Sequence, residues 1–543
     1  MSTAFGNFDY VIVGAGSAGC VLANRLTEDP SVTVLLIEAG GKDDWIWIRI
    51  PVGLYYILGN SRTDWCYSTE PEPGLNGRTL AVARGRTLGG SSSINGMVYI
   101  RGQARDFDVW RQAGNVGWSW EDVLPYFKKS EDHINGADEA HGAGGPLRVE
   151  GPRMRWKVLD ALRDAAQQRG VPHSDDFNRG NNEGCGYVDL TQRRATRWSA
   201  SRGFLRPAAR RPNLTVLTEA MVERVEIEQG RATGVTFRQG GGPARFARAD
   251  AEVIMAGGAY GSPQLLQVSG IGPADLLRSH GITVKVDLPG VGENLQDHLN
   301  ARFVQRLARG DTMNTRFNSL YLKALMGVEY ALLRRGPMTS GSPPLAGFLK
   351  SDPSQEVPDL QFLAGTVSYE RLGERPHDFP AIAGGICNMR PRSRGHVRIK
   401  SKASSDHPAI VHNYLMDPYD QALAVKSVRI MRDIFRAPAM QPYRPQEYMP
   451  GAAVQSDEQL LDYVRRTGST AFHPVGTCKM GDDAMAVVDA RLRVRGVGGF
   501  RVVDASIMPN LVSGNSNAAT IMIAEKAADM IRQDAKSQMG RAA

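Results

Sequence analysis

The sequence predicts an α/β fold that begins with a nucleotide-binding βαβ unit. An apolar run over 10–13 is typical of a buried strand, and an apolar run over 32–37 is typical of a second one. A helical pattern over 17–26 separates the two strands. The turn between the first strand and the helix, 14–19, has the spacing Gly-x-Gly-x-x-Gly, which is the fingerprint of a dinucleotide site in this context.

The three glycines of this turn leave the N-terminus of the helix open to a ligand. Side chains there would keep a pyrophosphate away from the free N–H groups and the positive end of the helix dipole. Glu38 ends the second strand, where an acid accepts hydrogen bonds from ribose hydroxyls. The fingerprint alone does not distinguish NAD from FAD.

Size and composition are those of an ordinary globular enzyme. The chain has 543 residues, enough for two or more domains, with 42% hydrophobic and 22% charged residues. Its net charge of +8 is mild, and the densest basic clusters, 193–194 and 206–211, are short. This favours a solvated basic surface over nucleic-acid binding, although such a surface is also compatible with anionic lipid headgroups or an acidic partner.

Cysteine usage and the N-terminus indicate the compartment. The five cysteines are odd in number, widely spaced and form no CxxC pair, which argues for a reducing compartment and against disulfides or a metal site. Residues 1–8 lack the pattern of a signal peptide, and no apolar run reaches about 18 residues. We therefore expect a cytoplasmic protein, with peripheral attachment to the inner face of the membrane left open.

A second small-residue segment, 84–102, is the richest in glycine and serine. Its centre, 89–93, lets the backbone approach a flat or charged ligand and supplies several N–H donors. Flexible linkers share this composition, but hydrophobic, strand-like residues flank the run on both sides. A ligand-contacting loop is therefore the better interpretation.

The remaining elements follow from periodicity and turn residues. Strands are expected over 214–217, 221–227, 234–237, 251–255, 395–400 and 500–504. Helices are expected over 155–169, 263–268, 320–334 and 420–435, and a last helix runs to about 531. The strand at 500–504 should fold back beside the first strand of the chain.

Three motifs in this order resemble the glucose–methanol–choline (GMC) oxidoreductase family: the turn at 14–19, the segment 85–108 and the segment 258–272. The resemblance runs nearly end to end and is greatest to the branch of bacterial choline dehydrogenases and FAD-dependent alcohol dehydrogenases. It implies a mixed α/β (α+β) fold. A Rossmann-like FAD-binding domain built from discontinuous segments would accompany a substrate domain with an antiparallel sheet and helices.

The resemblance also implies how these domains divide the chain. Residues 5–306 would carry most of the FAD-binding domain, and 307–390 a segment of the substrate domain. Residues 391–534 would carry the catalytic residues and the last FAD-binding strand.

The resemblance implies FAD as the cofactor. The residues matched to the family's FAD contacts are Gly14, Gly16, Ser17, Ala18, Gly19, Glu38, Ala39, Trp65, Thr87, Gly90, Asn95, Gly96, Met97, Val98, Val222, Asp504, Ala505, Asn517, Ala518 and Thr520. Some relatives attach FAD covalently through a histidine just before the asparagine of the 89–95 loop. Ile94 stands there, and an aliphatic side chain cannot make that bond, so we predict non-covalent FAD.

The resemblance assigns the catalytic base to His473. On its own residues, His473 is at least as well interpreted as a buried structural histidine. Alcohol oxidation moves a hydride to flavin N5 while the hydroxyl proton leaves, and a base with a pKa near neutrality suits that step. The family's second position, a histidine or an asparagine, is assigned to Asn517, with Asn515 as the register alternative. An amide can hold the substrate oxygen but cannot take the proton.

The predicted function is oxidation of a primary alcohol to an aldehyde, with electrons passed to a quinone or other carrier. Alternatives are an oxidase that uses O2 and makes H2O2, a choline dehydrogenase, and a non-redox lyase of the hydroxynitrile type. Choline-handling relatives commonly place an acid before the Gly-Phe pair that is here 347–348, and the segment 336–348 contains none. A neutral alcohol is therefore favoured, and the sequence does not predict the oligomeric state.

Overall fold

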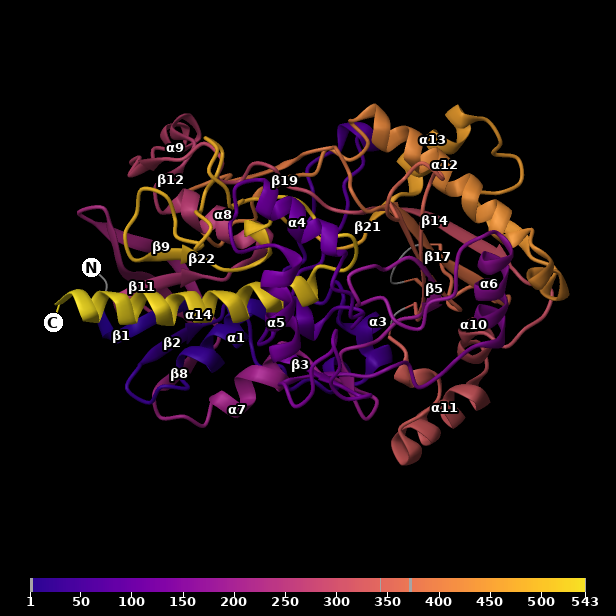
Figure 1. Cartoon of the computed structure of the whole chain (residues 1–543), viewed down its shortest axis with the longest axis horizontal. Helices are drawn as coiled ribbons and strands as arrows, with labels where there is room; N and C mark the ends of the chain where they lie inside the picture. Colours follow the sequence, from indigo (N-terminus) through magenta and orange to yellow (C-terminus); the bar gives the residue numbers. More distant parts are fainter. Residues whose placement is uncertain (1–2, 342, 371–373, 543) are drawn as a thin grey trace.

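Two large sheets organise the computed structural model, which describes residues 3–341, 343–370 and 374–542 (Figure 1). The first sheet has the order β8 (Leu214–Leu217), β2 (Val34–Ile37), β1 (Thr3–Val13), β11 (Arg245–Met255), β10 (Arg231–Gln239) and β9 (Ala220–Glu228). Strand β22 (Phe500–Val502) also pairs with β11. The pairs formed among β8, β2, β1, β11 and β22 are parallel, whereas β10 and β9 are antiparallel.

The predicted βαβ unit is confirmed, and its helix α1 (Ser17–Leu26) has the bounds expected from the sequence. A Cβ on Gly19 would lie 1.9 Å from the Gly14 carbonyl oxygen, so the third glycine lets the helix pack closely on the turn. The last helix, α14 (Asn517–Ala542), packs against α1 and α5 (Trp120–Ser130) (Figure 1). An ion pair between Arg25 and Glu525, with nitrogen and oxygen 2.7 Å apart, joins α1 to α14.

The second sheet is antiparallel throughout, which confirms the expectation for the substrate domain. Its order is β20 (Gln446–Met449), β14 (Leu299–Arg306), β17 (Ala381–Asn388), β16 (Leu360–Gly365), β15 (Leu345–Leu349) and β5 (Gly184–Tyr187), and β21 (Ser469–Thr470) pairs with β14. Helices α6 (Lys157–Gln168), α12 (Pro418–Phe435) and α13 (Asp457–Thr467) pack against it. Strands from all three predicted segments of the chain meet in this sheet, and the boundaries 5–306, 307–390 and 391–534 stay a prediction.

The remaining strands form separate two-stranded pairs outside the two large sheets. Further helices are α2 (Ile46–Arg49), α3 (Leu54–Ile57), α4 (Ala104–Gln112), α7 (Arg206–Ala208), α9 (Ala274–Ser279), α10 (Met313–Phe317) and α11 (Leu320–Leu333). The strands are β3 (Glu131–His133), β4 (Leu147–Val149), β6 (Gln192–Arg193), β7 (Thr196–Arg197), β12 (Ile271–Gly272), β13 (Val286–Asp287), β18 (His396–Arg398) and β19 (Ala409–Val411). Single helical turns include η1 (Pro51–Gly53), η3 (Gly90–Ser93) and η5 (Pro337–Thr339).

Helix α8 (Gly258–Val268) begins five residues earlier than the predicted 263–268. Pro263, the predicted start, instead lies inside the helix. Inside a helix Pro263 cannot donate to the carbonyl of Ala259. The Thr477 hydroxyl donates to that carbonyl instead, at 2.7 Å, so the missing bond is replaced from another part of the chain.

Two further expectations need correction. Helix α14 continues to Ala542 rather than ending near 531. Strand β22 ends at Val502, and it lies beside β11, which separates it from β1. Across the described ranges, no helix has the length and apolar character needed to cross a bilayer.

Candidate active site

A cavity of about 800 Å³ contains most of the residues that the sequence singled out. Its wall includes the β1–α1 turn, the 90–98 loop, strands of the antiparallel sheet, and the segments around His473 and Asn515. The cofactor residues predicted from the sequence that line it are Gly14, Gly16, Ser17, Ala18, Glu38, Ala39, Trp65, Gly90, Asn95, Gly96, Met97, Val98, Val222, Asp504, Ala505, Asn517 and Thr520.

Backbone forms the part of the cavity beside α1. Gly14 has φ +100°, and a Cβ there would lie 2.5 Å from the Ala256 carbonyl oxygen. Gly90 has φ +51°, and a Cβ there would lie 2.7 Å from the Cα of Gly16. No side chain caps α1, so its first N–H groups are open to an anion. This cradle fits the pyrophosphate of FAD.

Glu38 lies in the same part of the wall and is almost fully buried. Its carboxylate accepts the backbone N–H of Ala15 at 2.9 Å and that of Gly40 at 2.8 Å. Burial raises the pKa of Glu38 to about 7, and these two hydrogen bonds oppose the rise. Each carboxylate oxygen keeps a lone pair for a further donor, as a ribose hydroxyl requires.

Three predicted cofactor residues do not line the cavity. Gly19 packs against the Gly14 carbonyl. The Thr87 hydroxyl donates to the Gly41 carbonyl at 3.0 Å, and Ala518 is buried in the core of the first sheet. These three residues therefore contact the residues of the cavity wall without lining the cavity themselves.

The 90–98 loop is held by its own side chains. The Asn95 amide oxygen accepts the Met97 N–H at 3.0 Å and the Arg197 guanidinium at 2.8 Å. Met97 adopts φ +66°, an uncommon conformation for a residue with a side chain. Ile94 faces the cavity and packs with Ile48.

His473 is fixed through its backbone. Its N–H donates to the Asp297 carboxylate at 2.7 Å, and the Thr470 hydroxyl donates to the same carboxylate at 2.5 Å. The preceding residue, Phe472, has φ +65°, and its carbonyl accepts the Arg84 guanidinium at 2.6 Å. Such strain persists only where surrounding bonds hold it, and it is frequent at functional sites.

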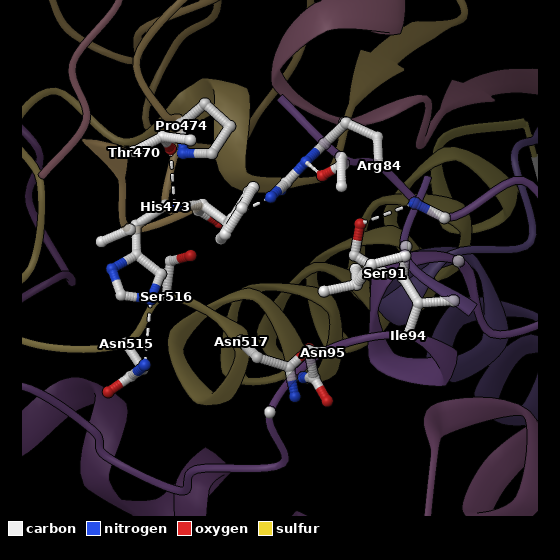
Figure 2. Close-up of a pocket in the computed structure, with 18 of the residues that line it drawn as sticks. Arg84, Ser91, Ile94, Asn95, Thr470, His473, Pro474, Asn515, Ser516 and Asn517 are labelled. Atoms are coloured by element: carbon white, nitrogen blue, oxygen red, sulfur yellow. Dashed lines mark hydrogen bonds between the residues drawn. The ribbon is translucent and has the colours of Figure 1, made fainter. Parts of the chain in front are cut away.

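The structure places Asn515, the register alternative, against His473. The two side chains meet at 2.9 Å, between Asn515 Nδ2 and His473 Nε2 (Figure 2). Asn517, the residue preferred from the sequence, lies apart from His473 (Figure 2), and its Oδ1 accepts the Ser17 hydroxyl at 2.7 Å. The preference for Asn517 as the partner of His473 is therefore corrected, because that side chain joins the N-termini of α14 and α1.

A second histidine fixes the proton positions of the first. His298 Nε2 lies 3.0 Å from the Met389 carbonyl, which can only accept, so Nε2 carries the hydrogen. In the neutral ring Nδ1 of His298 is then an acceptor, and it lies 3.0 Å from His473 Nδ1. His473 therefore carries its hydrogen on Nδ1, which leaves a lone pair on Nε2 at the cavity.

The environment keeps His473 neutral. Burial lowers the pKa of His473 to about 3, and the neighbouring His298 adds to the effect. Burial also lowers the pKa of His298. At physiological pH both rings are uncharged. In this structure the Nε2 lone pair accepts the Asn515 Nδ2–H group, and it becomes available as a base once a substrate hydroxyl replaces that bond. The pKa near neutrality that the sequence argument assumed is not found in this structure.

Asn515 is oriented by a further side chain. Its Oδ1 accepts the Gln361 amide at 3.3 Å, which leaves Nδ2 directed at His473. Sequence reasoning missed Gln361, Asp297 and His298. The adjacent acid and histidine at 297–298 were a visible signal, but nothing in the local pattern linked them to a histidine 175 residues later.

Known proteins resemble this chain over nearly its whole length. Two family models, both described as GMC oxidoreductase, match residues 8–300 and 391–524. The chain is 45% identical to the oxygen-dependent choline dehydrogenase of Yersinia pseudotuberculosis over 97% of its length and 94% of that protein. It is 44% identical to human mitochondrial choline dehydrogenase, over 97% and 90% of the two chains. The crystal structure of pyridoxine 4-oxidase from Mesorbium loti superposes with a TM-score of 0.87 at 33% identity, covering 97% and 99%.

Proposed function

The chain belongs to the GMC oxidoreductases, a family of FAD-dependent enzymes that act on alcohol donors, and we propose that it oxidises a neutral primary alcohol to an aldehyde. The observation that carries this proposal is the Nε2 lone pair of His473, held at the cavity beside an amide donor. A base and a donor on one substrate oxygen are what removal of a hydroxyl proton requires.

His473 and Asn515 have different roles at the substrate oxygen. FAD, when bound, supplies the acceptor for the hydride that leaves the alcohol carbon. His473 Nε2 takes the hydroxyl proton, and the Asn515 Nδ2–H group donates to the same oxygen as the C=O bond forms. Asp297 and His298 hold the imidazole in position and in the required tautomer. The C–H and O–H bonds break, and the aldehyde leaves.

The charge around the cavity favours a neutral substrate. Among the described lining residues the carboxylates are Glu38 and Asp504, both in the part assigned to FAD. Arg84 and Arg302 also line the cavity, so a quaternary ammonium group would meet positive charge. Of the acid-free segment 336–348, Ser342 lies outside the described residues. Choline is the second candidate, because both sequence relatives are named choline dehydrogenases.

We propose a quinone or another electron carrier as the acceptor. Dioxygen is the second candidate, since the relatives include an oxygen-dependent dehydrogenase and an oxidase. FAD is proposed to be non-covalent because Ile94, an aliphatic residue, faces the cavity at the position of the linking histidine. Acid precipitation should release the flavin into the supernatant. Yellow pelleted protein would contradict this.

An anaerobic panel of alcohols tests the function. Purified holoenzyme is mixed with aliphatic and benzylic primary alcohols and with choline, and the flavin absorbance is followed. Neutral alcohols should bleach the flavin with the larger specificity constant. A quinone analogue or air is then admitted, and the faster reoxidation identifies the acceptor. A better specificity constant for choline would overturn the substrate proposal, and turnover without bleaching would overturn the redox proposal.

A further inference from the structure

Helix α11 exposes most of its apolar side chains. Its exposed fractions include 85% for Leu320, 75% for Tyr321 and 76% for Leu332, and Leu325, Val328 and Leu333 are also exposed. Met326 and Tyr330, one turn apart, are its buried residues. Figure 1 shows α11 standing out from the molecule, away from the two termini. Contiguous apolar surface of this kind marks an interaction site.

Helix α11 contacts the hairpin of β6 and β7. The Tyr330 hydroxyl donates to the carbonyl of Ala195, in the turn between these strands, at 2.9 Å. The same hairpin contacts α2, and η5 connects α11 to η1. Ile46 of α2 and Tyr56 of α3 are each about half exposed, so apolar surface continues from α11 onto the adjoining segment.

Positive charge surrounds this apolar surface. Arg193 and Arg194, the densest basic pair noted in the sequence, are exposed at the hairpin turn. Lys323, Arg334 and Arg335 are exposed on α11 and just after it. The acid within the helix is Glu329, and Arg335 pairs with it at 3.3 Å. Leucines and a tyrosine beside unbalanced basic residues match the composition of a membrane-surface helix.

The positive charge of this surface also indicates which partner covers it, a second copy of the chain or a lipid bilayer. A two-fold contact between copies would place the same patch on both sides, so the net positive charge of both patches would be gathered in one interface. That arrangement is repulsive. An anionic bilayer offers apolar chains for the leucines and negative headgroups for the arginines. The 14-residue helix is too short to span a bilayer, so it would lie in the interface.

We propose that α11 and the β6–β7 turn form a docking face for an anionic lipid bilayer. The docking face consists of Leu320, Tyr321, Leu325, Val328, Leu332 and Leu333 with Lys323, Arg193, Arg194, Arg334 and Arg335. Docking places the leucines among the acyl chains and the basic side chains on the headgroups.

The docking face is connected to the cavity wall through η5. Helix α11 contacts η5, and Ser340 and Gly341, which follow η5, line the cavity. On this inference a lipid-dissolved quinone reaches the cavity from the docked side of the enzyme. This last step rests on the proposed function, whereas the docking itself does not.

Vesicle flotation of the holoenzyme tests the docking. Wild-type protein should float with vesicles of phosphatidylcholine and phosphatidylglycerol, bind pure phosphatidylcholine much less, and be released by salt. Leu332→Glu should weaken binding about tenfold or more, since an acid replaces an exposed leucine that docking would bury among the acyl chains. Val116→Glu is the matched control, because Val116 is 79% exposed on a different part of the surface and should bind as wild type does.

The variants also separate the docking from the catalytic proposal. Leu332→Glu should keep its flavin and its anaerobic bleaching by alcohol, and lose reduction of a long-chain quinone held in vesicles. Leu320→Glu serves as the second variant if Leu332→Glu is poorly folded. Failure of wild-type protein to float, or equal flotation of the docking-face variants and Val116→Glu, would overturn the docking. So would a wild-type dimer that Leu332→Glu converts to a monomer without vesicles. Loss of bleaching in wild type would count against the proposed function alone.

Discussion

The part of the cavity assigned to FAD and the part assigned to the alcohol differ in whether backbone or side chains form their walls. The part assigned to FAD is formed by backbone, at Gly14 and Gly90, where an added methyl group has no room. The part assigned to the alcohol is formed by side chains, His473, Asn515 and His298, joined by hydrogen bonds across the fold. Substitutions in the first part should exclude the cofactor sterically. Substitutions in the second part should lower the rate of flavin reduction while the cofactor stays bound.

Gly14→Ala should yield essentially flavin-free protein, because the new Cβ would lie 2.5 Å from the Ala256 carbonyl at a φ of +100°. Flavin absorbance per polypeptide measures this. Gly230→Ala is the matched control, since Gly230 also has positive φ but would meet nothing within 4 Å. Normal flavin content in Gly14→Ala would contradict the inference that the FAD part of the cavity depends on the absence of a side chain at Gly14.

His473→Ala should keep its flavin and reduce it about 10²- to 10⁴-fold more slowly, because no other base is placed at the alcohol oxygen. Anaerobic stopped-flow absorbance measures the rate. His173→Ala, a change at an exposed histidine, should be indistinguishable from wild type. A loss of less than about tenfold in His473→Ala would remove its assignment as base.

Asn515→Ala and Asn517→Ala should fail in different ways. Asn515→Ala should slow flavin reduction about 10- to 100-fold, because it removes a donor to the developing charge. Asn517→Ala should mainly weaken flavin retention, because it removes the bond to Ser17 at the α1 N-terminus. Reduction rates and flavin content are measured for both variants. The reverse pattern would restore the register that the sequence argument preferred.

His298→Leu should slow flavin reduction about tenfold with its flavin retained, because the His473 Nδ1–H group loses the bond that selects its tautomer. His298→Asn offers an acceptor oxygen at the δ position and should recover most of the rate. Equal loss in both variants would indicate a packing role rather than a positioning one.

A change of pH should have the smallest effect on the rate of flavin reduction. A base works when unprotonated, and the pKa of His473 is lowered to about 3 by burial, so it stays unprotonated from pH 8 down to pH 5. Activity should fall only as pH approaches the lowered pKa. An acid limb with a midpoint near pH 7 in the anaerobic reduction rate would contradict the neutral, buried state of His473.

The same contrast explains what could be predicted from the sequence. The βαβ unit was predicted to the residue at α1 because its signals are local: apolar period, glycine spacing and a terminal acid. The start of α8 was missed because its compensation for Pro263 comes from Thr477, far along the chain. Asn515 and Asn517 are chemically identical and two residues apart, so only the path of the loop before α14 could choose between them. His298 was missed because its pairing with His473 is a property of the fold.

The hydrogen bond between Ser17 and Asn517 joins positions 500 residues apart. Each is the first residue of its helix, and the Arg25–Glu525 ion pair clamps the same two helices. A growing chain therefore makes its glycine turn long before it makes the partner of that turn. During synthesis the cofactor cradle stays incomplete until α14 has left the ribosome, so tight flavin retention requires that α14 has been made.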